Sequence, residues 1–362
     1  MARPAPMKPR TQKEDKLSRL PPFVVDIGNA YLKCVCGDGE IAFVHALAEL
    51  MPSQWDYATQ RFGEGAPYDL IRFGDRFFAV GATAENFHMT KLTGRPKYSK
   101  EYYGVFFAAA VANMFRAKPD FLENGLDVVA SHATDDFGFR GYLSAAIRGK
   151  WDFECGGKRF KTETLRVRTF EESFGGYARK AYKFHKGAFS TPLRGQFCGI
   201  IDIGGGTCGV MAVDEMGVVQ QGMGKSGSVG ILNSLERLKA EVFRKYGDLF
   251  KNAQNPPESR FREALQTGIY RGFGQQLDVH KEVDMAIVPL MNDLMNLWKS
   301  KLQGGAGLDT VVLTGGGNGI LAQRVKEIIE FQNCILADNR DQIHYANVRG
   351  ARDFMMVAEE LR

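Results

Sequence analysis

The stretch VVDIGNAYLK, residues 24–33, returns in altered form as IIDIGGGTCG at residues 200–209. In both copies, two β-branched residues lead into Asp, Ile and Gly, a short turn of small or polar residues follows, and a second strand begins. Glycines in such turns permit positive φ angles and let successive backbone N–H groups face a common hollow, which forms a nest for an anion. The chain therefore carries the same candidate anion-binding hairpin twice.

Two such turns, one from each half of the chain, are predicted to bind a polyphosphate from two sides. Asp26 and Asp202 end the first strand of each copy, where hard carboxylates suit Mg²⁺ held through water. Lys33 can reach a phosphate as a point charge. The alternative is a pair of tight hairpins without a ligand, and the aspartate retained in both copies argues against it.

A third glycine-rich turn lies near the C-terminus, in VVLTGGGNG at residues 311–319. Here an apolar strand runs into three glycines and then into a predicted helix. The N-terminus of a helix with a bare backbone can approach a nucleotide closely. Taken alone, this motif is weak evidence for a nucleotide site, but it is the third glycine-rich turn along the chain and completes a set with the other two.

The composition indicates a globular protein with a basic N-terminal segment. Of 362 residues, 44% are hydrophobic and 25% are charged, and no apolar run approaches the roughly 20 residues of a membrane helix. The N-terminus lacks the apolar core of a secretory leader, and the six cysteines show neither a CxxC pair nor metal-type spacing. We therefore expect a cytoplasmic protein with reduced thiols and no membrane partner.

Most of the net charge of +5 belongs to residues 1–21, which carry six basic and two acidic side chains. Four prolines among residues 1–21 and few large apolar residues predict disorder for residues 1–22. A basic arm of this kind can contact nucleic acid or an acidic partner, and it can equally be a solvated leader. Direct contact with nucleic acid is expected only through this segment.

Strands and helices alternate along the rest of the chain, and the glycine-rich hairpins indicate an α/β protein with mixed sheets. Strands are expected within 23–45, 68–81, 127–133, 151–170, 197–224 and 309–314, and around 334–338. Helices are expected at 99–118, 171–185, 229–249, most of 257–302, 322–331 and 346–361, with a loop at 187–196.

Together, the three glycine turns resemble the actin, Hsp70 and sugar-kinase ATPase superfamily over roughly residues 23–362. The sequences DIGN (26–29) and ANVRG (346–350) are most similar to the ParM-like bacterial proteins of plasmid segregation. The resemblance implies a two-domain, actin-like fold of duplicated ribonuclease H-like units, with mixed sheets around a nucleotide cleft. It implies domain I at 23–185, with the C-terminal helix 346–362 returning to it, and domain II at 197–345.

The resemblance also implies roles for individual residues. The first phosphate loop would comprise Asp26, Gly28, Asn29 and Lys33, the second Asp202, Gly204, Gly205, Gly206 and Thr207, and the adenosine motif Gly315, Gly316 and Gly317. In ESFGGYA (172–178), Glu172 or its neighbour Glu171 would position the attacking water. In LERLKAE (235–241), Glu236 and Lys239 are candidate base or ribose contacts, with a solvated helix face as the alternative. GMGKSG (222–227) lacks the glycine spacing of a P-loop, so Lys225 and Ser226 are either ordinary loop residues or lie near the phosphates.

The implied activity is that of a filament-forming ATPase driven by ATP or GTP with Mg²⁺, in which Glu172 and Asp202 are catalytic and Asp26 and Asp202 serve the metal. The implied partners are further copies of the chain and a DNA-binding adaptor at a centromere-like site, as in plasmid segregation. Two other functions stay open at this stage: a monomeric phosphotransferase of the sugar-kinase kind, and a cytoskeletal scaffold with slow ATPase.

Overall fold

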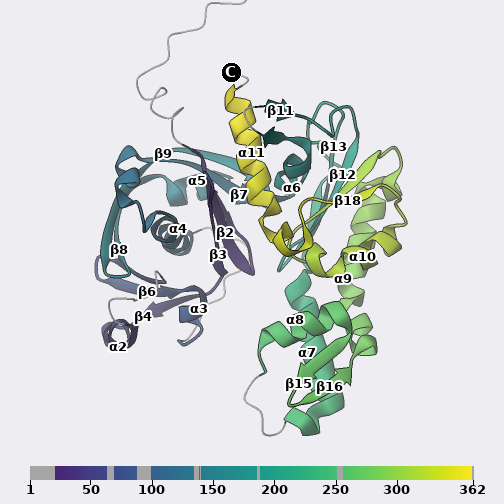
Figure 1. Ribbon diagram of the computed structural model, residues 1–362, viewed down its shortest axis with the longest axis horizontal. Helices are drawn as coiled ribbons and strands as arrows, with labels where there is room; N and C mark the ends of the chain where they lie inside the picture. Colours follow the sequence, from purple (N-terminus) through teal and green to yellow (C-terminus); the bar gives the residue numbers. More distant parts are fainter. Residues whose placement is uncertain are drawn as a thin grey trace, which may run out of the picture.

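A computed structural model shows two separate β-sheets connected by a pair of crossing helices (Figure 1). The structure describes residues 21–62, 69–87, 99–133, 138, 140–185, 188–250 and 256–360. Disorder was predicted for residues 1–22, of which residues 1–20 lie outside this part of the chain. Within it, no helix is long and apolar enough to cross a membrane, and all six cysteines are unpaired.

The first sheet has nine strands in the order β3-β2-β1-β7-β9-β8-β5-β6-β4. Its strands are β1 (Phe23–Ile27), β2 (Tyr31–Cys36), β3 (Gly39–Val44), β4 (Leu47–Leu50), β5 (Leu70–Phe73), β6 (Arg76–Val80), β7 (Leu126–His132), β8 (Gly149–Cys155) and β9 (Lys158–Glu171). Its helices are α2 (Pro52–Phe62), α3 (Gly81–Ala84), α4 (Lys100–Phe115), the 3₁₀ helix η3 (Pro119–Asn124), α5 (Arg140–Ile147) and α6 (Glu172–Ala181).

Helix α4 forms the core of this part of the molecule. Every residue from 103 to 112 is buried, as expected for a helix that is apolar on all sides. The sheet curls around α4, with β8, β6 and the β2–β3 hairpin on different sides of the helix (Figure 1). The helix predicted at 99–118 is therefore confirmed and forms part of the core.

The second sheet has five strands in the order β14-β13-β12-β17-β18. Its strands are β12 (Cys198–Ile203), β13 (Cys208–Val213), β14 (Lys225–Gly227), β17 (Thr310–Thr314) and β18 (Cys334–Leu336). The remaining helices are α7 (Ile231–Phe250), α8 (Glu258–Thr267), α9 (His280–Lys301), η5 (Gln303–Gly305), α10 (Asn318–Ile329), η6 (Arg340–Tyr345) and α11 (Ala346–Glu360). Two small hairpins complete the fold, β10 (Lys183–His185) with β11 (Ala188–Ser190), and β15 (Ile269–Gly272) with β16 (Gln275–Asp278).

The duplication seen in the two hairpins extends to the sheets that contain them. β1 pairs with β2 antiparallel and with β7 parallel, and β12 pairs with β13 antiparallel and with β17 parallel. The run β3-β2-β1-β7-β9 in the first sheet thus matches β14-β13-β12-β17-β18 in the second. The predicted α/β fold with duplicated mixed sheets is confirmed, whereas the domain boundaries at 185 and 197 stay a prediction.

Helices α6 and α11 cross in direct backbone contact between the two sheets (Figure 1). A Cβ atom on Gly350 of α11 would overlap the carbonyl oxygen of Gly175 of α6, and one on Gly175 would overlap the carbonyl of Asn347. Glycine is required here because the two backbones leave no room for a side chain. Beyond this crossing, Val348, Ala351 and Met355 of α11 pack with Val24 of β1.

Residues 257–302 are mostly helical, as predicted, although the β15–β16 hairpin separates α8 from α9, with Phe273 and Gly274 at positive φ angles in its turn. Two local predictions were wrong. The helix predicted to 185 ends at Ala181, and residues 183–185 pair with β11 inside the segment predicted as a loop. The strands predicted within 197–224 include β12 and β13, but the next strand of this sheet, β14, lies beyond that segment at Lys225–Gly227.

Candidate functional site

The two matching turns meet face to face between the sheets. In the first, the N–H of Gly28 donates to the carbonyl of Tyr31 over 3.1 Å, and in the second the N–H of Gly204 donates to the carbonyl of Thr207 over 2.8 Å. Each turn therefore has two central residues and is closed by the same hydrogen bond. A Cβ atom on Gly205 would lie 2.6 Å from the Cβ of Ala30, so the turns touch.

Close approach, and not backbone conformation, explains the glycines of these turns. We expected positive φ angles there, but Gly28, Gly204, Gly205 and Gly206 all have φ outside the left-handed region. A Cβ atom on Gly206 would lie 2.5 Å from the side-chain nitrogen of Asn29 in the opposite turn. The absence of side chains at Gly205 and Gly206 thus lets the two sheets approach each other.

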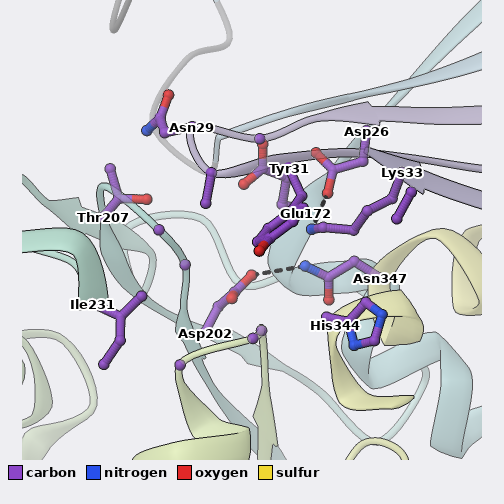
Figure 2. A pocket seen from close by; sticks show the side chains of 18 of the residues that line it. Asp26, Asn29, Tyr31, Lys33, Glu172, Asp202, Thr207, Ile231, His344 and Asn347 are labelled. Carbon is purple, nitrogen blue, oxygen red and sulfur yellow. Dashed lines mark hydrogen bonds and ion pairs between the residues drawn. The ribbon is translucent and has the colours of Figure 1, made fainter. Parts of the chain in front are cut away.

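A cavity of about 430 Å³ lies at this meeting point, a volume suited to a small-molecule ligand. It draws its lining from both sheets and from α6, α7, α8, η6 and α11 (Figure 2). Twelve of the predicted site residues line it: Asp26, Gly28, Asn29, Lys33, Glu172, Asp202, Gly204, Gly205, Thr207, Gly315, Gly316 and Gly317.

On the side of the first sheet, Asp26 and Lys33 form a buried ion pair. The two residues are cross-strand partners on β1 and β2, which explains their separation of seven positions. The Nζ of Lys33 lies 2.7 Å from one oxygen of Asp26, and the hydroxyl of Ser131 donates to the other over 2.7 Å. Burial opposes the charge on Lys33, but the Asp26 carboxylate raises the pKa of Lys33 above its usual value. The ammonium is therefore retained at the cavity.

On the side of the second sheet, Asp202 is held by α11. The amide nitrogen of Asn347 donates to Asp202 over 3.0 Å (Figure 2). The side-chain carbonyl oxygen of Asn347 accepts from the hydroxyl of Thr314 over 2.7 Å. Burial raises the pKa of Asp202 to about 6, an effect that the hydrogen bond from Asn347 partly offsets. The cross-strand partner of Asp202 is Gly209, so the second copy of the hairpin has no counterpart of Lys33.

The third glycine turn packs directly on the second hairpin. Gly315 has φ of 83°, and a Cβ atom there would overlap a carboxylate oxygen of Asp202. The N–H of Gly317 donates to the carbonyl of Ile203 over 2.8 Å. The turn follows β17, which runs parallel to β12 with Thr314 opposite Asp202. The three glycine turns are distant in sequence, but in the folded chain they pack against one another and surround the same cavity.

The sequence left open whether Glu171 or Glu172 would position the attacking water, and the structure distinguishes the two. Glu172 is the first residue of α6 and lines the cavity, where its side chain lies between Asp26 and Asp202 (Figure 2). Glu171 is the last residue of β9, is buried, and has its carboxylate 3.6 Å from the guanidinium of Arg140. Only Glu172 is therefore placed to face a bound ligand, and its role stays a prediction.

Three predicted site residues do not line the cavity: Gly206, which packs against Asn29, and the candidate base or ribose contacts Glu236 and Lys239. Glu236 and Lys239 lie on α7, where the Glu236 side chain is 70% exposed and pairs with Lys239 at 2.8 Å. Neither residue is among those lining the cavity. The cavity instead reaches the first residue of α7, Ile231, and Arg262 of α8, whose guanidinium lies 5.7 Å from the centre of the Tyr31 ring.

Sequence reasoning also missed Arg262, His344 and Asn347 as cavity residues. Asn347 lies in the ANVRG motif, so the motif was informative although the residue was not singled out. Burial and the charge of Lys33 lower the pKa of His344, which indicates a neutral imidazole at the cavity. No pattern around Arg262 or His344 distinguishes them from surface residues, because only the folded chain brings them to the cavity.

The acidic residues fit a magnesium ion that arrives with a phosphate ligand. Among the described residues, no group of three or more His, Cys, Asp or Glu side chains could hold a metal ion by itself. Magnesium typically keeps several waters and binds through one or two carboxylates together with substrate phosphates. Asp26 and Asp202, facing one cavity from opposite sheets, provide such a pair.

Comparisons with known proteins agree with this architecture. A family model for the C-terminal part of archaeal, MreB-like actin homologues matches residues 200–327, and no curated protein sequence matches the chain. The archaeal actin homologue Ta0583 has a TM-score of 0.73 at 17% identity, over 93% of this chain and 99% of that one. ParM from a Clostridium botulinum filament has a TM-score of 0.67 at 16% identity, over 93% and 99%. ParM from Bacillus thuringiensis, solved with ATP, has a TM-score of 0.64 at 15% identity, over 94% and 99%.

These likenesses confirm the predicted resemblance to the actin-like superfamily and its ParM-like members at the level of the fold. The chain has the two-domain, actin-like fold, and its three glycine turns occupy the cleft between the duplicated sheets.

Proposed function

We propose that this chain is an actin-like ATPase that binds ATP or GTP with Mg²⁺ and assembles into filaments in the nucleotide-bound state. One observation carries the proposal: two turns of the same construction, one from each sheet, meet at a single cavity that also holds three carboxylates. The fold alone would not suffice, because one fold can host several activities.

The phosphates of the nucleotide bind between the two turns. Backbone N–H groups of residues 29–31 and 205–207 contact the phosphate oxygens, and Lys33 adds a positive charge from the first sheet. The carbonyls of Gly204 and Gly205 accept hydrogen bonds from the first N–H groups of α7, which directs these oxygens away from an anion. Relatives of the same fold solved with ADP and with ATP support a nucleotide as the ligand.

The base binds on the side of Ile231 and Arg262. Arg262 of α8 and Tyr31 of β2 both line the cavity and approach each other there. A separate hollow of about 410 Å³ is lined by Leu265 of α8, the helix that carries Arg262, and by Ile320 of α10, which begins right after Gly317. We therefore place the base beside Ile231 and Arg262, and not beside Glu236 and Lys239 as the sequence predicted.

Hydrolysis uses the carboxylates that face the phosphates. Asp26 and Asp202 would hold Mg²⁺ through its bound waters, and the ion would supply Lewis-acid stabilisation of the phosphate charge. Glu172 accepts a hydrogen bond from the attacking water and orients it toward the terminal phosphate. Lys33 stabilises the negative charge that develops on the phosphate groups.

Filament assembly follows from closure of the cleft around the nucleotide. A triphosphate that contacts both turns holds the two sheets together, and the α6–α11 crossing is the connection about which they move. Closed subunits associate head to tail, because heterologous contacts that do not form a ring produce filaments. A ParM filament among the structural relatives supports self-association, and by the same resemblance we propose a role in plasmid segregation with a DNA-binding adaptor, in the cytoplasm.

High-speed pelleting and light scattering test the proposal directly. Protein mixed with Mg-ATP or Mg-GTP should pellet above a critical concentration, and phosphate release should accompany assembly. Asp202→Asn should lose both responses, whereas Asp341→Asn, at an exposed aspartate of η6, should keep them. Hydrolysis without pelleting that rises when sugars are added would identify a phosphotransferase instead, and pelleting without hydrolysis would identify a scaffold.

A further inference from the structure

A small chamber adjoins the cavity at Glu172 and Asp202. Its volume is about 10 Å³, which is room for a single water molecule. Glu172, Asp202 and Thr207 line both the chamber and the main cavity, so the two spaces are contiguous. The chamber thus faces whatever group sits between the carboxylates.

Two serine hydroxyls from different elements complete the chamber. Ser173 follows Glu172 on α6, and Ser226 lies on β14, the edge strand of the second sheet. Both flank Gly209 of β13: a Cβ atom on Gly209 would lie 3.3 Å from the Ser226 hydroxyl and 3.6 Å from the Ser173 hydroxyl. The missing side chain at position 209 is what leaves space between them.

This arrangement also shows which residue of the GKS sequence, which resembles part of a P-loop, belongs to the site. Neighbouring residues on a strand point to opposite faces, and on β14 the side chain of Lys225 is exposed whereas Ser226 faces inward to the chamber. The serine and not the lysine of this segment therefore belongs to the site.

We propose that the chamber seats the water molecule that attacks the nucleotide, and that Ser226 is a positioning residue for hydrolysis. A buried water needs two to four polar partners, and a hydroxyl can donate one hydrogen bond while accepting others. Glu172 accepts from the water on the cavity side, and Ser226 holds it from the second sheet. The inference rests on the proposed ATPase function.

The reaction then balances without any change at the serine. The water oxygen forms a bond to the terminal phosphorus while the bond from that phosphorus to the bridging oxygen breaks, and the electron pair stays on the departing diphosphate. The proton released by the water goes to the Glu172 carboxylate. Ser226 keeps its own proton and acts only by fixing the direction of attack.

Two substitutions test the proposal from opposite sides. Ser226→Ala removes the hydroxyl that holds the water from the second sheet. Gly209→Ala places a methyl group between the hydroxyls of Ser173 and Ser226 and displaces the water. Both should lower kcat for phosphate release by about 10- to 100-fold, because a poorly oriented nucleophile loses rate on this scale. The Kd for a fluorescent ATP analogue should change by less than about twofold, since neither residue lines the main cavity.

The control is Lys225→Ala, at the neighbouring exposed residue, which should keep both kcat and Kd. Equal loss of kcat and nucleotide affinity in Ser226→Ala, or a kcat within twofold of wild type in both variants, would overturn the water seat. An inactive wild-type protein would overturn the proposed function itself, and this inference with it. An active wild type with unaffected variants would overturn only the inference.

Discussion

Gly205 lies against Ala30, so that a Cβ atom on the glycine would stand 2.6 Å from the Cβ of the alanine and 3.0 Å from its nitrogen. These residues are at the tips of the two duplicated hairpins, and their contact fixes how closely the sheets approach. The geometry of the site therefore depends on the absence of a side-chain methyl group at Gly205.

Gly205→Ala should separate the two turns and weaken nucleotide binding at least tenfold. Its methyl group meets backbone and Cβ atoms that cannot rotate away, and overpacking of this kind costs about 1–3 kcal/mol. Gly206→Ala should be milder, because its methyl group meets the flexible side chain of Asn29. Titration of a fluorescent ATP analogue measures both effects.

The control for this series is Gly247→Ala, at a glycine of α7 with no heavy atom near its added methyl group. It should keep nucleotide affinity and leave stability unchanged or slightly raised. Wild-type affinity in Gly205→Ala would show that the contact between the turns does not shape the site.

Lys33→Met should destabilise the protein as well as weaken nucleotide binding. It leaves the buried carboxylate of Asp26 without its cation, and loss of one partner of a buried pair costs about 3–5 kcal/mol. The double variant Asp26→Asn with Lys33→Met should recover part of this stability but not the affinity. Urea denaturation and nucleotide titration separate the two roles.

Lys239→Met is the matched comparison, because the Lys239 pair with Glu236 lies at the surface and is worth under about 1 kcal/mol. It should also leave nucleotide affinity intact, since the residue does not line the cavity. A clear loss of affinity in this variant would restore the base contact that the sequence predicted.

Asp202→Asn should stabilise the protein when neither nucleotide nor Mg²⁺ is present. Burial raises the pKa of Asp202 to about 6, above the value near 3.9 expected in the unfolded chain. The native state therefore binds the proton more tightly, and its stability falls as the pH rises from about 4 to about 6. At pH 7.5 the asparagine should gain about 2–3 kcal/mol.

Urea denaturation between pH 4 and pH 8 measures this effect as the difference between variant and wild type. The difference should grow with pH and vanish near pH 4. A variant less stable than wild type at pH 7.5 would mean that the charged carboxylate is better accommodated in the fold than its burial indicates.

Glu40→Gln should loosen the contact between the edge of the first sheet and the segment that follows β18. Arg349 of α11 donates to Glu40 over 2.7 and 2.6 Å and to Asp338 over 2.9 Å. Charge-assisted hydrogen bonds of this kind contribute about 1.5–3 kcal/mol. Loss of the pair should appear as a lower midpoint of urea denaturation at pH 7.

The effect should depend on pH in a defined direction. The hydrogen bond from Arg349 lowers the pKa of Glu40, so its stabilising contribution is present at neutral pH and is lost as the pH falls through the lowered pKa. The difference between Glu40→Gln and wild type should therefore shrink below about pH 4. Glu49→Gln breaks a similar pair with Arg76 at an exposed position and should cost under about 1 kcal/mol. Equal costs at both sites would argue against a special role for the buried pair.

Much of the fold and the phosphate end of the site follow from local sequence. Each hairpin contains its own strand, turn and carboxylate, and the cross-strand register alone brings Lys33 to Asp26. The third turn is equally local, and Glu172 follows from its place at the start of α6.

The remainder of the site depends on how distant segments pack. Arg262 reaches the cavity because α8, and not the exposed face of α7, borders it. Asn347 reaches Asp202 because α6 and α11 cross in backbone contact at Gly175 and Gly350. Helical periodicity shows which faces of a helix are apolar, but it does not show which helix approaches a given turn.

Hydrogen–deuterium exchange tests most directly whether both turns hold the same nucleotide. Saturating Mg-ATP should slow amide exchange in peptides covering residues 28–33 and 204–207 to a similar degree, while a peptide covering 235–241 should not change. Protection of only one turn, or of neither, in protein shown to be saturated with nucleotide would contradict a triphosphate held between the two hairpins.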